Sequence, residues 1–210
     1  MSQKILIDFD KLSNLHSGLG QFSFQLAKEL SQISNKDLTY LVPDEYVNRF
    51  GANVQYQRMR AFYKLFGIQT QAGDILHLTH QLSDIKASNK KTISILTIHD
   101  LNYLYKYTGL KRKAFLKSLQ AKVNRADIIT AISKFTEIEI QNNLNLNDKK
   151  IHVIYNGSNP LDINSAVKPK WFNWEDEFYF SIGIFTEKKN FHTLLPVIEL
   201  VPNAKLIIAG

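Results

Sequence analysis

The chain has 210 residues, of which 44% are hydrophobic and 21% are charged, as in ordinary globular proteins and unlike disordered chains. It contains no cysteine, which excludes disulfides, thiolate metal sites and a cysteine nucleophile. No apolar run of about 18 residues occurs, and the first residues become charged too soon for a signal peptide. We therefore expect a cytoplasmic protein.

The charge of the chain is positive and unevenly distributed. Lys and Arg number 26 against 19 Asp and Glu, which gives a formal net charge of +7. Such an excess favours nucleic acid, anionic lipid or phosphorylated small molecules as partners without choosing among them. Within residues 101–126 the charged side chains are all basic: Lys106, Lys111, Arg112, Lys113, Lys117, Lys122 and Arg125. This segment indicates either a solvated helix face or a surface for acidic headgroups or an acidic acceptor.

Short apolar runs alternate with amphipathic stretches of helical length. In chain order we predict a strand at 5–9, a helix at 21–33, strands at 38–42, 74–78 and 92–98, a helix at 110–124, a strand at 127–131, a helix at 134–143 and a strand at 151–154. Ser133 is placed to cap the helix that follows it. Residues 44–72 mix aromatic and basic side chains and allow no firm assignment. Strands separated by helices predict βαβ units and a parallel sheet.

The residue composition of the chain changes after residue 154. Turn-forming residues dominate 155–169, as expected of a linker between domains. A strand at 178–182, a loop at Gly183, a helix at about 190–200 and a strand at 205–209 follow. Two strands and one helix cannot close a core of their own, so we expect this part to be a second domain cut short, or to pack on the first domain or on a partner.

Two closely spaced glycines, Gly18 and Gly20, lie between the first strand and the first helix. Glycines at such a place let the backbone approach a ligand, and the free amides of a helix start attract phosphate. The dinucleotide-binding fingerprint is incomplete, because Ser23 stands where its third glycine would be. The pattern is typical of a phosphate-binding turn and equally of a tight strand-to-helix connection.

His99 follows directly after a predicted buried strand. In open parallel sheets ligands bind beyond the carboxyl ends of the strands, where a histidine can donate to a substrate oxygen or act as an acid or base. A structural histidine is the alternative. His77 and His80 flank the preceding strand end and Asp100 is adjacent, but their spacing matches no known metal site. We therefore expect no metal.

Lys188 and Lys189 lie between Gly183 and a predicted helix. Adjacent ammonium groups near free backbone amides suit a diphosphate, although an exposed basic turn is nearly as good an explanation. The P-loop pattern, the Gly-x-Ser-x-Gly elbow and the HExxH motif are all absent. No carboxylate pair can be assigned to glycoside hydrolysis, so these enzyme classes are excluded.

Taken in order, several segments resemble the retaining, GT-B-fold glycosyltransferases of family four (the group one glycosyltransferases), especially mannosyltransferase-like members. The resemblance runs from residue 4 to residue 210. It rests on GLGQF at 18–22, DILH at 74–77, LTIHDL at 96–101, ADIITAISKF at 126–135, IHVIYNG at 151–157, FSIG at 180–183 and KKN at 188–190.

The resemblance implies an α/β fold in which a Rossmann-like doubly wound parallel sheet is followed by an incomplete second Rossmann-like domain. It divides the chain into an acceptor-side domain at 1–155, a linker at 156–176 and the start of a donor-binding domain at 177–210. It places Gly18 and Gly20 near the donor diphosphate and acceptor, and His99 beside the transferred sugar as a catalytic residue. Such enzymes need no metal or other cofactor.

The resemblance also assigns residues around and after the linker. Asn156 and Gly157 would mark the crossover between the domains, and Lys188 and Lys189 would clamp the diphosphate of the leaving group. Many relatives have Arg where this chain has Ile184, and others have Arg-Lys where it has two lysines. Their paired glutamates, which hold the donor, lie further downstream, so we expect this chain alone to be inactive.

The function implied is transfer of a hexose from a nucleotide-diphosphate sugar to a lipid-linked or saccharide acceptor in cell-surface polysaccharide synthesis. The protein would lie in the cytoplasm, with peripheral contact to the anionic inner membrane face through residues 101–126. The alternative is a non-catalytic binding module for an acidic glycan, a membrane surface or a partner chain. Nucleic-acid binding through the same segment is a weaker possibility, since no nucleic-acid-binding module pattern occurs.

Overall fold

The structure is a computed structural model that describes residues 3–33, 37–158, 163–173, 175, 177–183, 185–201 and 203–210. The chain divides into two compact units, Met1–Ser158 and Asn159–Gly210, which are described separately. The division lies within the linker predicted at 156–176. Among the described residues, no helix is both long enough and apolar enough to cross a bilayer.

The first unit is built on seven parallel strands in the order β3-β2-β1-β4-β5-β6-β7. The strands are β1 Lys4–Asp8, β2 Asp37–Val42, β3 Gln55–Arg58, β4 Ile75–Leu78, β5 Ile93–Ile98, β6 Ile128–Ala131 and β7 Ile151–Val153. This confirms the predicted Rossmann-like α/β fold. Within 44–72, where no assignment was made, lie β3, the 3-10 turn η2 (Asp44–Tyr46) and the short helix α2 (Tyr63–Phe66).

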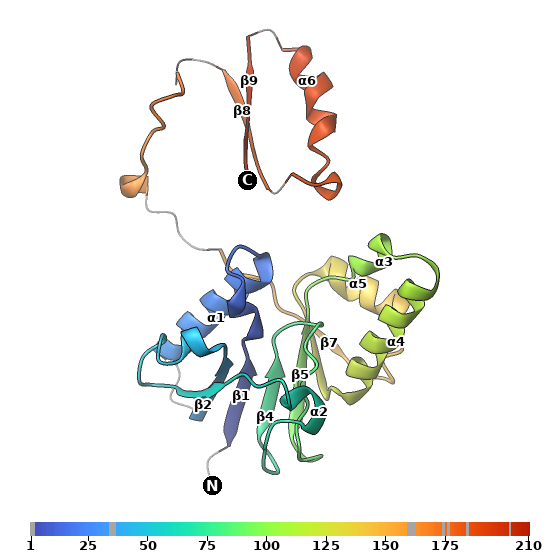
Figure 1. The fold of residues 1–210 in the computed structure, drawn as a ribbon. Helices are drawn as coiled ribbons and strands as arrows, with labels where there is room; N and C mark the ends of the chain where they lie inside the picture. Colours follow the sequence, from blue (N-terminus) through green and yellow to red (C-terminus); the bar gives the residue numbers. More distant parts are fainter. Residues whose placement is uncertain are drawn as a thin grey trace. The chain divides into compact units, whose positions relative to one another are not determined.

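Helices cover the sheet from both sides (Figure 1). They are α1 Gly18–Ile33, α3 Tyr103–Lys106, α4 Gly109–Arg125 and α5 Lys134–Asn143. Neighbouring residues of β1 point to opposite faces: Leu6 joins an apolar cluster with Leu119 of α4 and Ile140 of α5, whereas Ile7 joins another with Ala27 of α1. Parallel strands buried on both faces read as continuous apolar runs, which explains why the central strands of this sheet could be predicted.

The starts of α1 and α5 are each capped by a serine. The Thr136 N–H donates to Ser133 Oγ, which confirms the predicted cap. Helix α1 begins at Gly18, earlier than the predicted start at residue 21, because the Gly20 N–H donates to Ser17 Oγ at 3.0 Å. Both glycines of the motif therefore lie in the first turn of α1.

The second unit contains a parallel pair of strands, β8 (Phe178–Ile182) and β9 (Lys205–Ala209), as predicted. Its remaining described elements are short: η3 Ile163–Ser165, η4 Glu187–Lys189, η5 Phe191–Leu194 and α6 Leu195–Glu199. The helix predicted over about 190–200 is thus divided into a 3-10 segment and a short α-helix. The backbone of Asn190 has the left-handed conformation, with φ 55°. Pro196, in the first turn of α6, has no N–H that could donate a helical hydrogen bond to the preceding turn.

We predict that Gly20→Ala destabilises the first unit by about 1–3 kcal/mol, measured as the free energy of unfolding in urea. A Cβ on Gly20 would lie 1.9 Å from the carbonyl oxygen of Asn14, which is a backbone atom and cannot rotate away. The matched control is Gly18→Ala, since a Cβ there meets nothing within 4 Å. Equal stabilities of the two variants would contradict this account of the motif.

Candidate functional site

The candidate site lies where the strand order changes direction. The chain proceeds from β1 outwards to β2 on one side, and then returns to β4 on the other side of β1. Asp8, the last residue of β1, is in register with Leu78, the last residue of β4. Ligands of open parallel sheets bind beyond the carboxyl ends of strands at such a reversal. The residues that follow β1, β4 and β5 therefore form the candidate site.

His99 follows β5 and is held by three hydrogen bonds. Its Nε2 lies 2.9 Å from the Thr79 carbonyl oxygen, its backbone N–H donates to Gln81 Oε1 at 3.1 Å, and its carbonyl accepts from Thr136 Oγ1 at 3.0 Å. A carbonyl oxygen only accepts, so Nε2 carries the proton and Nδ1 is left as an acceptor. The side chain is 8% exposed. The ring is thus fixed in one tautomer and one orientation.

Burial lowers the pKa of His99 below its ordinary value, although the hydrogen bond to Thr79 opposes the shift. The imidazole is therefore mainly neutral at pH 7. The ring of Phe22, on α1, meets it edge-on with centroids 4.6 Å apart. The structure thus brings together His99 and the helix whose first turn contains Gly18 and Gly20.

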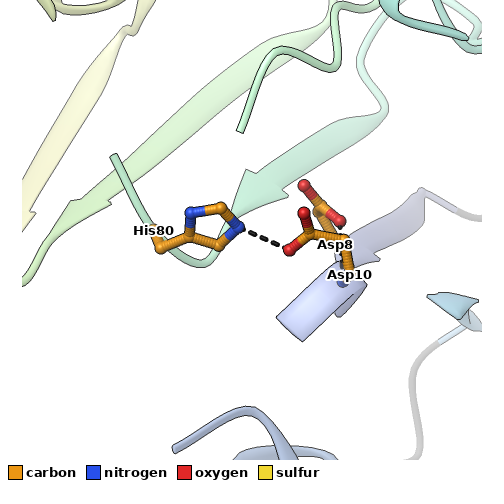
Figure 2. A group of neighbouring side chains, drawn as sticks. All are labelled: Asp8, Asp10 and His80. Atoms are coloured by element: carbon orange, nitrogen blue, oxygen red, sulfur yellow. Dashed lines mark hydrogen bonds and ion pairs between the residues drawn. The ribbon is translucent and has the colours of Figure 1, made fainter. Parts of the chain in front are cut away.

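Beside His99 lies a second group, Asp8, Asp10 and His80, which Figure 2 shows in detail. His80 Nε2 is 2.6 Å from Asp10 Oδ1, and the Leu82 N–H donates to His80 Nδ1 at 3.1 Å. Asp8 accepts from the Asp10 N–H at 3.1 Å and from the Ser83 hydroxyl in a short hydrogen bond. Since Nδ1 accepts from Leu82, the proton of His80 lies on Nε2 and faces Asp10.

The two carboxylates of this group are shifted in opposite directions. Burial, together with the charge of Asp10, raises the pKa of Asp8 to about 6. Burial would also raise the pKa of Asp10, but its hydrogen bond and charge interaction with His80, and the neighbouring Lys11, lower it overall. The arrangement can therefore hold a proton on Asp8 while Asp10 stays anionic, as in other carboxylate pairs with divergent environments.

Asp8, Asp10 and His80 also form the group of potential metal ligands that the described residues bring together, with one ligand atom of each within 4.8 Å of the others. A cation there would displace the His80–Asp10 hydrogen bond. This group differs from the set of candidate metal ligands considered from the sequence, which combined three histidines with Asp100. His77 instead hydrogen-bonds to Thr97 within the sheet, and burial lowers its pKa to about 4.

Sequence reasoning missed Asp8 and Asp10 as site residues. The first strand was predicted to extend through Phe9, with Asp8 as an interior residue of the strand. In the structure β1 ends at Asp8. Two carboxylates separated by one residue at the end of a buried strand were the available signal. Their partner His80 lies 70 residues away in the chain, so only the strand order reveals the contact.

The remaining predicted site residues lie at the end of the first unit and in the second. Asn156 and Gly157 follow β7 without regular structure, and a Cβ at Gly157 would meet nothing within 4 Å. Lys189 ends η4, and its Cε lies 3.2 Å from the position of a Cβ on Gly183, which has φ +151°. The side chain of Lys188 and all of Ile184 lie outside the described residues.

In the basic segment 101–126, the seven cations differ in environment. Six are exposed on α3 or α4: Lys106, Lys111, Arg112, Lys113, Lys117 and Arg125. Lys122 is buried and pairs with Asp84 at 2.9 Å. The segment is therefore mostly, but not wholly, a solvated basic surface.

Comparison with known proteins gives one family. The model of the family described as Glycosyltransferase Family 4 matches residues 18–160, which begins at the first residue of α1 and includes His80 and His99. Asp8, Asp10 and Lys189 lie outside the matched range. A search among curated proteins gave no significant match.

We predict that Asp8→Asn stabilises the protein more at pH 8 than at pH 4. The pKa of Asp8 is raised from 3.8 to about 6, so the folded state binds an extra proton between these values. The stability that comes from the protonated Asp8 carboxyl is complete below pH 3.8 and is lost as the pH rises through 6. Asn, which resembles the protonated form, removes the loss.

The difference between the two pH values is expected to be about 3 kcal/mol, because each pKa unit corresponds to about 1.4 kcal/mol. It is measured by urea unfolding of variant and parent at both pH values. Asp44→Asn, which also removes one carboxylate, but at an exposed position, is the matched control. A pH-independent effect of Asp8→Asn would refute the raised pKa.

Proposed function

The chain belongs to glycosyltransferase family 4, and we propose that it takes part in transferring a hexose from a nucleotide-diphosphate sugar to a lipid-linked or saccharide acceptor, with retention of configuration. Membership of this family implies transferase activity. The identity of the donor class, the acceptor class and cell-surface polysaccharide synthesis as the setting are our proposals, as is a position at the cytoplasmic face of the membrane.

The observation that carries the proposal is the contact between His99 and α1 at the carboxyl ends of the strands. His99 presents Nδ1 as an acceptor. Its ring contacts Phe22 of α1. The same helix begins at Gly18, where no side chain covers the backbone. A neutral acceptor suits a sugar hydroxyl, while free amides and a bare backbone suit phosphate oxygens. We propose that Nδ1 of His99 accepts a hydrogen bond from the transferred sugar and that Gly18 leaves room for the diphosphate.

The two glycines have different roles in this proposal. Gly20 is required by the Asn14 carbonyl that lies against it, so its place in the motif has a packing reason. Gly18 borders open space and is the position where the backbone can approach a ligand. We assign donor contact to Gly18 and only an indirect part to Gly20.

We propose that the negative charge of Asp10 faces the acceptor. His80 donates to its Oδ1 and Lys11 to its Oδ2, and these partners keep the carboxylate anionic. An anionic oxygen at the end of β1 suits the hydroxyl of an acceptor as a hydrogen-bond donor. His80 then acts as a positioning residue that orients Asp10.

Lys188 and Lys189 are proposed to bind the donor diphosphate. Gly183 and Asn190, on either side of the two lysines, both have positive φ, and the side-chain carbons of Lys189 lie close to Gly183. A lysine placed in this way offers a point charge for the leaving group. A non-catalytic module would keep phosphate binding but show no transfer, so the assays below also distinguish that alternative.

We expect His99→Ala and His99→Gln each to lower kcat/KM for sugar transfer at least about tenfold, the scale of one lost positioning contact in a transition state. The assay uses the gene product that contains these 210 residues, with a nucleotide sugar as donor. Gln retains a donor for the Thr79 carbonyl and loses Nδ1, so its loss of activity should come without loss of stability. His152→Ala, at an exposed position on β7, is the matched control.

We expect Lys189→Ala to lower the same rate at least about tenfold, mainly through a higher KM for the donor, because a Lys–phosphate contact contributes binding energy. Lys170→Ala changes an exposed lysine of the same unit and serves as control. Equal KM values for the two variants would remove the second unit from the donor site. Absence of transfer by the parent protein, with intact nucleotide binding, would favour the binding module.

A further inference from the structure

A shallow cavity of about 300 Å³ lies on the outer face of the first unit, between α2, α4 and the segment that follows β4. Its charged lining consists of Lys64, Lys86, Lys122, Arg125 and Asp84, and Ser118 and Ala121 of α4 complete it. None of these residues belongs to the group around His99. The lining positions on α4 are spaced as one helical face.

The cations of this cavity are unequally neutralised. Lys122 is buried, pairs with Asp84 at 2.9 Å and donates to the Gln81 carbonyl at 3.1 Å. Lys64, Lys86 and Arg125 are exposed, and no ion pair or side-chain hydrogen bond joins them to another described residue. Three unpaired cations around one concavity favour an anion with more than one oxygen, and the guanidinium of Arg125 suits a phosphate in particular.

Large apolar side chains are exposed beside these cations. Leu65 and Phe66 follow Lys64 on α2 and are 77% and 78% exposed, and Phe62 on the same turn is 51% exposed. Interfaces with duplex nucleic acid are polar and strongly basic, so an exposed leucine and phenylalanine beside the cations argue against duplex RNA or DNA. Apolar and aromatic side chains beside lysines are typical of surfaces that enter the membrane interface.

We propose that this cavity binds the phosphate of an anionic phospholipid, while Leu65 and Phe66 enter the bilayer interface. The occupant is chosen by charge complementarity together with the apolar rim, which a free phosphate would leave exposed to water. The site includes Lys122 and Arg125 from the basic segment 101–126 and adds Lys64 and Lys86, which the sequence did not single out. It concerns where the protein resides and is independent of the sugar that it transfers.

The test is co-sedimentation with vesicles of phosphatidylcholine alone and with vesicles that also contain phosphatidylglycerol. We expect binding to the second kind, with Lys64→Glu/Arg125→Glu lowering the partition coefficient at least about tenfold, since the variant replaces two cations near an anionic surface by two anions. The control, Lys28→Glu/Lys150→Glu, makes the same change in net charge at exposed positions outside the cavity. It should lower binding less than about threefold.

A third variant, Leu65→Ser/Phe66→Ser, changes no charge and should also weaken vesicle binding, which a free-phosphate site would not predict. Equal effects of the two glutamate variants, or equal binding to both kinds of vesicle, would overturn the proposal. Release from the vesicles by inorganic phosphate would assign the cavity to a free anion instead. Tighter retention of a single-stranded RNA through the same residues would assign it to nucleic acid. No sugar donor is present, so the outcome is separate from that of the transfer assays.

Discussion

The geometry of the candidate site depends on how the chain after β4 is bound to the chain after β5. Thr79 accepts from the ring of His99, and Gln81 both accepts from the His99 backbone N–H and donates to the Asp100 carbonyl at 3.0 Å. Neither segment belongs to a helix or strand at these positions. Their polar groups, buried at the end of the sheet, satisfy one another. This pairing decides which nitrogen of His99 is available to a ligand, and the function proposed for the site follows from that choice.

Burial acts on the ionisable groups of this sheet edge in two opposite ways. It keeps the imidazoles of His77 and His99 uncharged, since it lowers the pKa of both. It also raises the pKa of Asp8, while the hydrogen bonds of Asp10 to His80 and Lys11 lower the pKa of Asp10 and keep it an anion. At neutral pH, which lies above the pKa of about 6 of Asp8, both carboxylates are anionic and the two imidazoles are neutral. Carboxylates and neutral imidazoles both accept hydrogen bonds, so this setting favours ligands that carry hydroxyl groups.

The sequence was sufficient for the strands that contain a run of apolar residues. Four of the six residues of β5 are isoleucine or leucine, so both its place and the parallel sheet could be predicted. The edge strand β3 (Gln55–Arg58) could not, because its side chains are polar and only partly buried. His99 was identifiable from its place after a strand. The Asp10–His80 pair was not, because a contact across 70 residues depends on which strands are neighbours. Sequence also gave no means of separating Gly20, fixed by a backbone contact, from Gly18, which borders open space.

The double attachment of Lys122 has a mechanical consequence. The connection from residue 79 to residue 92 has no helix to stiffen it, yet one ammonium group of α4 holds its Gln81 carbonyl and its Asp84 carboxylate together. Further along, Ile68 and Ala87 form a β-bridge that fastens it again. We therefore expect this connection to be held rigidly and not to act as a hinge. It is a poor place to cut, extend or permute the chain, even though its irregular backbone resembles a tolerant surface loop.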